Sequence, residues 1–215
     1  MRKMVMEMLD KVRTTVVRSR ADSRSHRGHT HLVRGALAEA LADYSQAIRL
    51  TPDAAELYAR RGLVRYKLGD LSGALEDLDE AVRLDPILSQ AYLNRGLVNY
   101  ALGQFGDAIA DYNLAAYYDP TNPTPYNNRA LADEAQGSLR AAIADYSDAI
   151  RVKPDYTMAY VNRANARHDL GDLRGALSDF RQYLALGGGR QHGDQARVED
   201  AIAHLEAQLR KHAHP

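Results

Sequence analysis

Histidines are the first residues in this 215-residue chain whose spacing could support chemistry. His26, His29 and His31 lie close together, and imidazole nitrogens are common ligands of divalent metals. In a helix, His26 and His29 would share one face and His31 would not, and Asp22 is the one well-placed carboxylate nearby. We therefore interpret the segment as solvated and irregular, and expect no metal site and no cofactor.

The sequence also lacks the usual signs of catalysis. It has no cysteine, so it has no thiolate nucleophile, no thiolate metal ligand and no disulfide. We find no glycine-rich phosphate loop, no HExxH and no nucleophile elbow. Single Ser and Asp residues occur, but nothing in the sequence arranges them. The sequence therefore predicts that the protein is not an enzyme.

A row of asparagines offers binding chemistry instead. Asn94, Asn128 and Asn162 recur at a spacing of 34 residues. Each carboxamide has both donor and acceptor groups, so a row of them can pair with successive peptide groups of an extended chain. The alternative is that these side chains bond to neighbouring helices or to water.

Arginine and aspartate recur with the same period, sixteen positions apart. The pairs are Arg27 and Asp43, Arg61 and Asp77, Arg95 and Asp111, Arg129 and Asp145, and Arg163 and Asp179. An unpaired charge between packed helices would be costly, so we predict a ladder of ion pairs, either within each repeat or to its neighbour. A structural pair that fixes register is favoured over recognition of an acidic ligand.

These residues belong to a unit that repeats every 34 residues, which is the strongest signal in the sequence. The registers that agree are Gly35, Gly69, Gly103, Gly137 and Gly171; Ala40, Ala74, Ala108, Ala142 and Ala176; and Tyr44, Leu78, Tyr112, Tyr146 and Phe180. Apolar spacings of three and four predict two helices per unit, roughly 57–68 and 72–84 in the second copy. Gly69 suits the left-handed turn between them, and Asp70 can cap the second.

This pattern resembles the tetratricopeptide repeat family over about residues 19–186. The resemblance implies an all-α fold, a right-handed α-solenoid of about five two-helix repeats, whose first helices line a concave groove. The repeats are placed at 21–54, 55–88, 89–122, 123–156 and 157–186. One departure is the arginine ladder, which occupies a position where the family usually has a large residue.

The resemblance also implies which residues face the groove and bind a protein or an extended peptide. They are Arg60, Leu63, Tyr66, Lys67, Gln90, Leu93, Asn94, Leu97, Tyr100, Asn127, Asn128, Leu131, Asn162 and Asn165. The family's clamp for chaperone C-terminal carboxylates needs Lys and Arg in a later repeat. Thr124 with Asn128, and Met158 with Asn162, occupy those positions, so the clamp is missing.

The N-terminal end departs from the repeat. Residues 1–20 are predicted to form a basic amphipathic helix with an apolar stripe of Met1, Met4, Val5, Met8, Leu9, Val12 and Val16. That helix would cover the end of the stack, bind a partner helix or a second copy, or lie on an anionic membrane. The first helix of the first repeat is eroded, and we expect it to be frayed or irregular.

The C-terminal end begins with Gly187, Gly188 and Gly189. We interpret residues 187–195 as a glycine-rich, flexible linker and residues 196–211 as a capping helix. The apolar side chains expected to pack on the last repeat are Val198, Ala201, Ile202, Leu205 and Leu209.

Charge and hydropathy limit the partners. The chain has 28 basic and 28 acidic residues, but residues 1–34 carry nine Lys or Arg against three Asp or Glu. No aromatic residue is interleaved with those charges before Tyr44, which argues against specific nucleic-acid binding. No apolar run is long enough for a membrane span, and the N-terminus does not look like a secretory signal, so we expect a cytoplasmic address.

The sequence therefore predicts a protein–protein interaction scaffold that binds a peptide or protein segment in the concave groove. The alternative is a structural module that self-associates, as a homodimer, through the Met- and Val-rich N-terminal helix.

Overall fold

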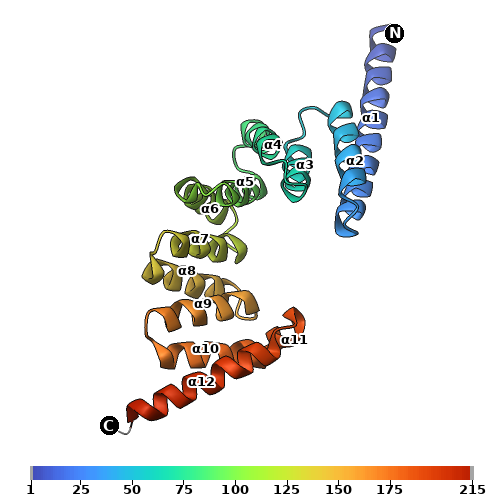
Figure 1. Cartoon of the computed structure of the whole chain (residues 1–215). Helices are drawn as coiled ribbons and strands as arrows, with labels where there is room; N and C mark the ends of the chain where they lie inside the picture. The colour runs from blue at the N-terminus through green and yellow to red at the C-terminus, as the bar shows by residue number, and fades with distance from the viewer. Residues whose placement is uncertain (1, 214–215) are drawn as a thin grey trace. The chain divides into compact units, whose positions relative to one another are not determined.

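The computed structural model describes residues 2–213, and of the first helix's opening stretch it describes the side chains of residues 3 and 6 and those from 13 on. Of the predicted Met and Val stripe, Val16 is described and is 45% exposed, and the members at residues 1–12 lie outside the described side chains. Residues 2–213 form twelve helices and no strand (Figure 1). They are α1 (Arg2–Val33), α2 (Leu37–Leu50), α3 (Ala55–Lys67), α4 (Leu71–Leu84), α5 (Ser89–Ala101), α6 (Phe105–Tyr118), α7 (Thr124–Ala135), α8 (Leu139–Val152), α9 (Thr157–Asp169), α10 (Leu173–Ala185), α11 (Gly188–His192) and α12 (Gln195–Ala213).

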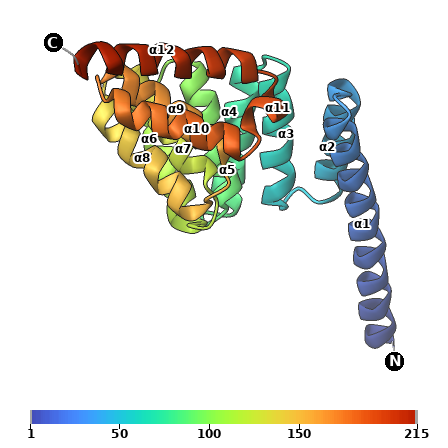
Figure 2. The same ribbon diagram turned by 90° about the horizontal axis from the view of Figure 1, so that it is seen from below.

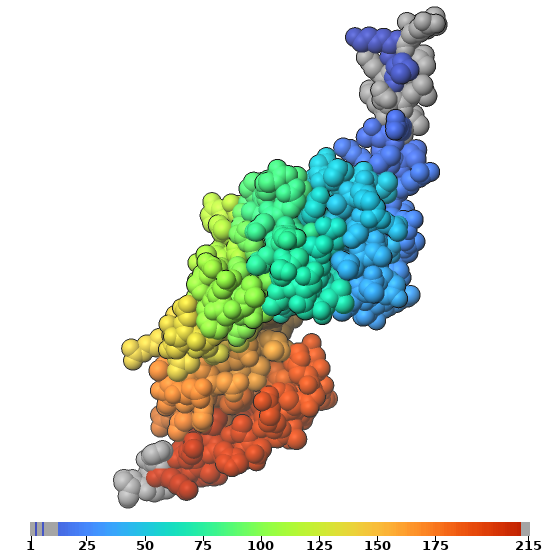
Figure 3. Space-filling model, turned by 45° about the horizontal axis from the view of Figure 1, so that its top comes forward, coloured from blue at the N-terminus to red at the C-terminus, as the bar shows by residue number. Residues whose placement is uncertain are grey.

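The chain forms two compact units that divide between Leu102 and Gly103. The first unit contains α1 to α5, and the second contains α6 to α12. In both units, helices that follow one another along the chain pack side by side and form adjacent bands of surface (Figure 3). The predicted all-α architecture of repeated helix pairs is confirmed.

The turn between the two helices of a repeat depends on glycine. Gly69 has a φ of 82°, in the left-handed region that residues with a Cβ rarely adopt, and the other four glycines of this register have the same conformation. Asp70 follows, and its carboxylate accepts a hydrogen bond from the Gly73 amide at 3.0 Å, which caps α4 as predicted. Asp172 caps α10 in the same way.

The core is built from the predicted small and large registers. All five alanines of the small register are completely buried, which lets the paired helices approach closely. The large residue four positions later fills the space between the helices, and none of its five copies is more than 5% exposed. Within the two units, these side chains pack at the contacts of α1 with α2, α3 with α4, α7 with α8 and α9 with α10.

The predicted Arg–Asp ladder is present, and four of its pairs form within their own repeats. Bidentate pairs join Arg27 to Asp43, Arg61 to Asp77, Arg129 to Asp145 and Arg163 to Asp179. Arg95 and Asp111 belong to different units, so their pairing stays a prediction. Each arginine also lies over the tyrosine three positions before it where the register has one, as Arg163 does over Tyr160 at 5.8 Å.

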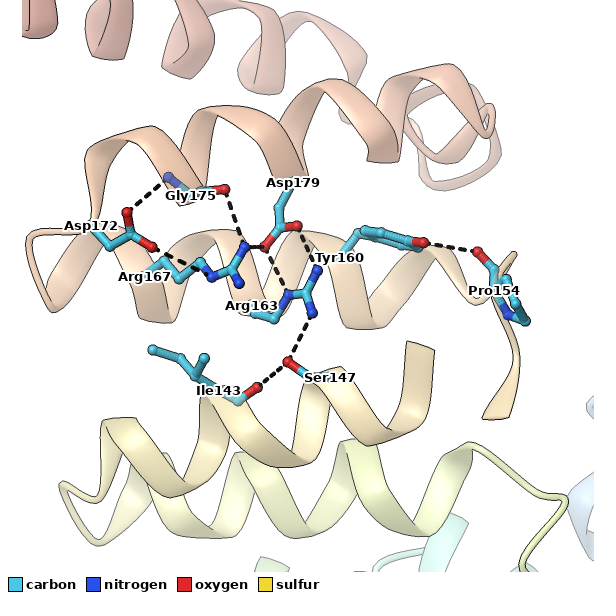
Figure 4. A network of polar contacts seen from close by, with 9 residues as sticks. All are labelled: Ile143, Ser147, Pro154, Tyr160, Arg163, Arg167, Asp172, Gly175 and Asp179. Atoms are coloured by element: carbon cyan, nitrogen blue, oxygen red, sulfur yellow. Dashed lines mark hydrogen bonds and ion pairs between the residues drawn. The ribbon is translucent and has the colours of Figure 1, made fainter. Parts of the chain in front are cut away.

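The third guanidinium nitrogen reaches the preceding repeat. Arg163 donates from Nη1 to the Ser147 hydroxyl at 2.8 Å (Figure 4). Arg61 and Arg129 make the equivalent bonds to Ser45 and Asn113. Arg95 bonds Asp79 in the same register at 2.7 Å. The ladder therefore joins both helices of one repeat to the second helix of the repeat before it.

At the end of the second unit, the position that accepts this bond in the earlier repeats carries a hydrogen-bond donor instead. Arg181 stands one period after Ser147, and it donates to Glu206 of α12 at 2.7 Å. The capping helix, which lies beside α10 in Figures 1 and 2, thereby takes the place of a further repeat.

The expectation of a frayed first helix was wrong. Residues 2–33 form one continuous helix that passes through the predicted boundary at residue 20 and extends well beyond the end of α2 (Figures 1 and 2). Polar contacts join this part of α1 to α2, because Arg24, Arg27 and His31 all contact the buried carboxylate of Asp43. A Cβ on Gly28 would lie 3.1 Å from the Tyr44 ring, closer than an ordinary van der Waals contact, so glycine suits this position.

The segment predicted as a flexible linker is also ordered. It contains the short helix α11, whose Gly188 and Gly189 are buried. A Cβ on Gly188 would lie 2.2 Å from the Tyr183 ring, so glycine is required here for close packing. Tyr183 donates to Asp194 at 2.7 Å, and Val198 and Leu205 of α12 complete the core around Phe180 as expected.

Candidate peptide-binding groove

The first unit contains a cavity of about 340 Å³ between its first helices, α1, α3 and α5. Its lining residues are His29 and Leu32 of α1, Glu56, Ala59, Arg60 and Leu63 of α3, and Leu88, Gln90 and Asn94 at the start of α5. Four of these side chains are apolar and five are polar. Such a mixture is typical of a site that buries an apolar group and orients it with a few hydrogen bonds.

The repeat explains why the lining residues meet. Leu63 lies one period after His29, and Asn94 lies one period after Arg60. Residues of one register occupy equivalent places on successive first helices, so stacking brings them to the same side. Of the predicted groove residues, Arg60, Leu63, Gln90 and Asn94 line this cavity.

The charge in the cavity is mixed. Arg60 lies 3.9 Å from Glu56, one turn earlier on α3, in a largely exposed pair. Behind it, burial raises the pKa of the Tyr44 phenol, and the nearby Arg60 guanidinium partly opposes that rise. One arginine beside one glutamate and one histidine gives the cavity no strong preference for a charged ligand.

Asn94 serves the scaffold as well as the cavity. Its Nδ2 donates to the Ala59 carbonyl of α3 at 3.1 Å, its Oδ1 accepts from Gln90 at 2.8 Å, and the residue is 2% exposed. Its hydrogen-bonding groups are thus largely used within the protein. Asn94 therefore bonds to a neighbouring helix, which is the alternative to peptide binding that the sequence left open for the asparagine row.

Five other predicted residues of the first unit do not line this cavity. Leu93 is buried at 6% exposure, Tyr66, Leu97 and Tyr100 are half-buried, and Lys67 is exposed. The remaining predicted residues lie in the second unit. There, Asn162 donates to Asn127 at 3.0 Å, and Asn127 donates to the half-buried Asn128 at 3.4 Å, so these amides join α9 to α7.

Leu131 and Asn165 differ in their surroundings. Leu131 is partly buried against the core of α7, α8 and α9. Asn165 is exposed and lines a separate cavity of about 260 Å³ with His168 of α9 and Phe180, next to α12.

The predicted groove set did not include five of the lining residues, His29, Leu32, Glu56, Ala59 and Leu88. The first two were missed because the first helix of the first repeat was taken to be irregular. Their register was the signal that could have found them, since His29 precedes Leu63 by one period. No group of three or more His, Cys, Asp or Glu side chains that could hold a metal occurs among the described residues.

Three sequence models of one family match the chain. All three describe the tetratricopeptide repeat, at residues 28–93, 89–122 and 127–191. The chain belongs to the tetratricopeptide repeat family. A search of curated proteins finds no match. Members of this family generally serve as scaffolds for protein–protein interaction, and the repeats support that general role here.

Solved structures agree on the fold. PilF of Pseudomonas aeruginosa is 16% identical, with 90% of this chain and 91% of that chain covered and a TM-score of 0.75. The thermophilic tetratricopeptide repeat protein TTC0263 of Thermus thermophilus is 19% identical, with 85% and 99% covered and a TM-score of 0.72. MamA from Desulfovibrio magneticus is 20% identical, with 79% and 96% covered and a TM-score of 0.67. At these identities the likeness concerns the fold alone.

None of the helices in residues 2–213 combines the length and the apolar character that crossing a membrane requires.

Proposed function

We propose that this tetratricopeptide repeat protein is a binding scaffold, without catalysis, that takes an extended segment of another polypeptide in the cavity of its first unit. The observation that carries the proposal is the combination of Leu32, Leu63 and Leu88 with polar side chains around one cavity of about 340 Å³. Burial of an apolar anchor supplies affinity, and the polar groups supply orientation. A cytoplasmic location and the lack of a nucleic-acid partner remain predictions.

Peptides selected from a random displayed library on the wild-type protein would test this. Leu63→Glu places a charge on the cavity lining and should weaken the selected peptides at least tenfold in a direct binding assay. Leu68→Glu is the matched control, because Leu68 follows α3 directly, is 46% exposed and does not line the cavity. Peptides that bind both variants as well as the wild type would place the binding surface elsewhere.

Self-association through α1 is the second candidate. The observation that favours it is length: α1 spans 32 residues, whereas its partner α2 spans 14. Among its described side chains, those of residues 13–16 and 18–20 are exposed. An exposed helical stretch has little stability of its own, so a second copy packed against it would stabilise it. Sedimentation of the full chain beside a version that starts at Ala21 tests this, since a dimer lost on truncation would support it. A monomer in both cases would contradict it.

A further inference from the structure

A second cavity, of about 500 Å³, lies between α1 and α2 and has a different chemistry. It is lined by Ser19, Arg20, Ser23 and Arg24 of α1 and by Gln46, Arg49 and Leu50 of α2. Three of the seven side chains are guanidinium groups, and none of the seven is acidic. The cavity of about 340 Å³ that is proposed above to bind a peptide shares no residue with this one.

The repeat shows how unusual the α1 side of this cavity is. One period later, the equivalents of Arg20, Ser23 and Arg24 are Ala54, Leu57 and Tyr58. Those three side chains belong to the apolar core that joins α3 to α2. On α1 the same positions are cationic or carry a hydroxyl, so this face is not built to receive an apolar helix.

The α2 side departs from the repeat in a matching way. Arg83 of α4 and Arg151 of α8 occupy the same register as Arg49. Each pairs with an acidic residue three positions before it, Arg83 with Glu80 at 2.7 Å and Arg151 with Asp148 at 2.9 Å. In α2 the residue at that place is Gln46.

The positive charge at this cavity is therefore not cancelled. Within residues 2–213, neither Arg20 nor Arg49 has an ion-pair partner. Arg24 makes a contact of 3.6 Å with Asp43, a carboxylate that Arg27 already holds with two nitrogens. The Arg24 side chain is 39% exposed, so it can turn toward a ligand at little cost.

We propose that this cavity binds a carboxylate-rich segment of a partner protein. Guanidinium groups pair with carboxylates through two parallel hydrogen bonds, and the hydroxyls of Ser19 and Ser23 and the amide of Gln46 add donors between them. A volume of about 500 Å³ accommodates several acidic side chains. The lining has no aromatic ring on which a base could stack, which favours an acidic peptide over a nucleic acid.

A fluorescein-labelled peptide of six glutamates is the probe, and anisotropy with the full chain is the measurement. We expect saturable binding that weakens as salt is raised, and no binding of the matching glutamine peptide. Arg49→Glu and Arg20→Glu should each weaken the glutamate peptide at least tenfold. Arg83→Glu makes the same change of charge at the same register of α4 and should leave binding within about twofold.

Several results would overturn the proposal. They are no binding of the glutamate peptide, an equal loss in Arg83→Glu, and competition by inorganic phosphate or oligothymidine that is tighter than by the peptide itself. Leu63→Glu separates this site from the groove, because it should leave glutamate-peptide binding unchanged even where it abolishes groove binding. Thermal unfolding of each variant identifies any loss that reflects misfolding.

Discussion

Arg163 holds the carboxylate of Asp179 with two nitrogens, Nε to Oδ2 at 2.9 Å and Nη2 to Oδ1 at 2.7 Å. Arg167 adds a third bond from one turn further along α9, at 2.7 Å (Figure 4). The Asp179 side chain is 4% exposed, and those of Arg163 and Arg167 are 13% and 24% exposed. One buried carboxylate on α10 thus fixes two guanidinium groups of α9.

Asp179→Ala should lower the free energy of unfolding by roughly 3–5 kcal/mol, because it leaves two partly buried guanidinium groups without their shared partner. Urea unfolding followed by circular dichroism measures the loss. Asp148→Ala is the control: it removes an exposed partner of Arg151 and should cost less than about 1 kcal/mol. Equal effects of the two substitutions would mean that the ladder contributes no more than surface ion pairs.

Asn94→Ala should destabilise the first unit by about 1 kcal/mol, since it removes the bond to Ala59 and the acceptor of Gln90. Asn165→Ala removes an exposed carboxamide and should change stability by less than about 0.5 kcal/mol. Thermal unfolding of the two variants checks this. A stable Asn94→Ala variant that no longer binds groove peptides would instead assign Asn94 a binding role.

Asp133→Asn should raise the melting temperature at pH 7. Burial, together with the neighbouring Asp145 carboxylate, raises the pKa of Asp133. The folded chain therefore holds this proton more tightly than the unfolded chain, so the stability that it contributes is present at low pH and is lost as pH rises through the raised pKa.

The gain from Asp133→Asn should accordingly shrink as pH falls and disappear below about pH 3, where the carboxyl is protonated in both states. Melting temperatures measured across that range test the sign. Asp169→Asn, at a carboxylate whose side chain is 65% exposed, is the control and should show little change at any pH. A gain that persists at low pH would show that the charge of Asp133 is not its cause.

Gly62→Ala should destabilise the protein although alanine favours helices by about 1 kcal/mol over glycine. The new Cβ would lie 2.8 Å from Leu78 Cγ and 3.2 Å from the Ala74 carbonyl oxygen, and such overpacking costs about 1–3 kcal/mol. Gly106→Ala has no atom within 4 Å of the new Cβ and should be neutral or stabilising. Chemical denaturation of both variants decides, and a more stable Gly62→Ala would mean that α3 and α4 separate easily.

The repeat and its ion pairs were readable from the sequence because they depend on short-range relations. Gly69 must adopt a left-handed conformation in a tight turn, and Leu78 must face the partner helix, whatever the rest of the chain does. Arg61 and Asp77 are sixteen residues apart on adjoining helices, so their pairing follows once the two helices are placed. The first helix of the first repeat was wrongly predicted to be irregular, because it has polar residues at positions that are apolar in the other repeats.

By itself, then, the sequence determined the family, the helix pairs and the Arg–Asp ladder, because a period of 34 residues fixes which side chains share a face. The tertiary structure alone decided which of those side chains remain available to a ligand. Asn94 and Asn162 are engaged by neighbouring repeats, while Arg20 and Arg49 line a cavity that has no acidic residue in its lining. The physical reason is that a side chain's availability depends on the helices stacked beside it, and periodicity within one repeat does not specify those contacts.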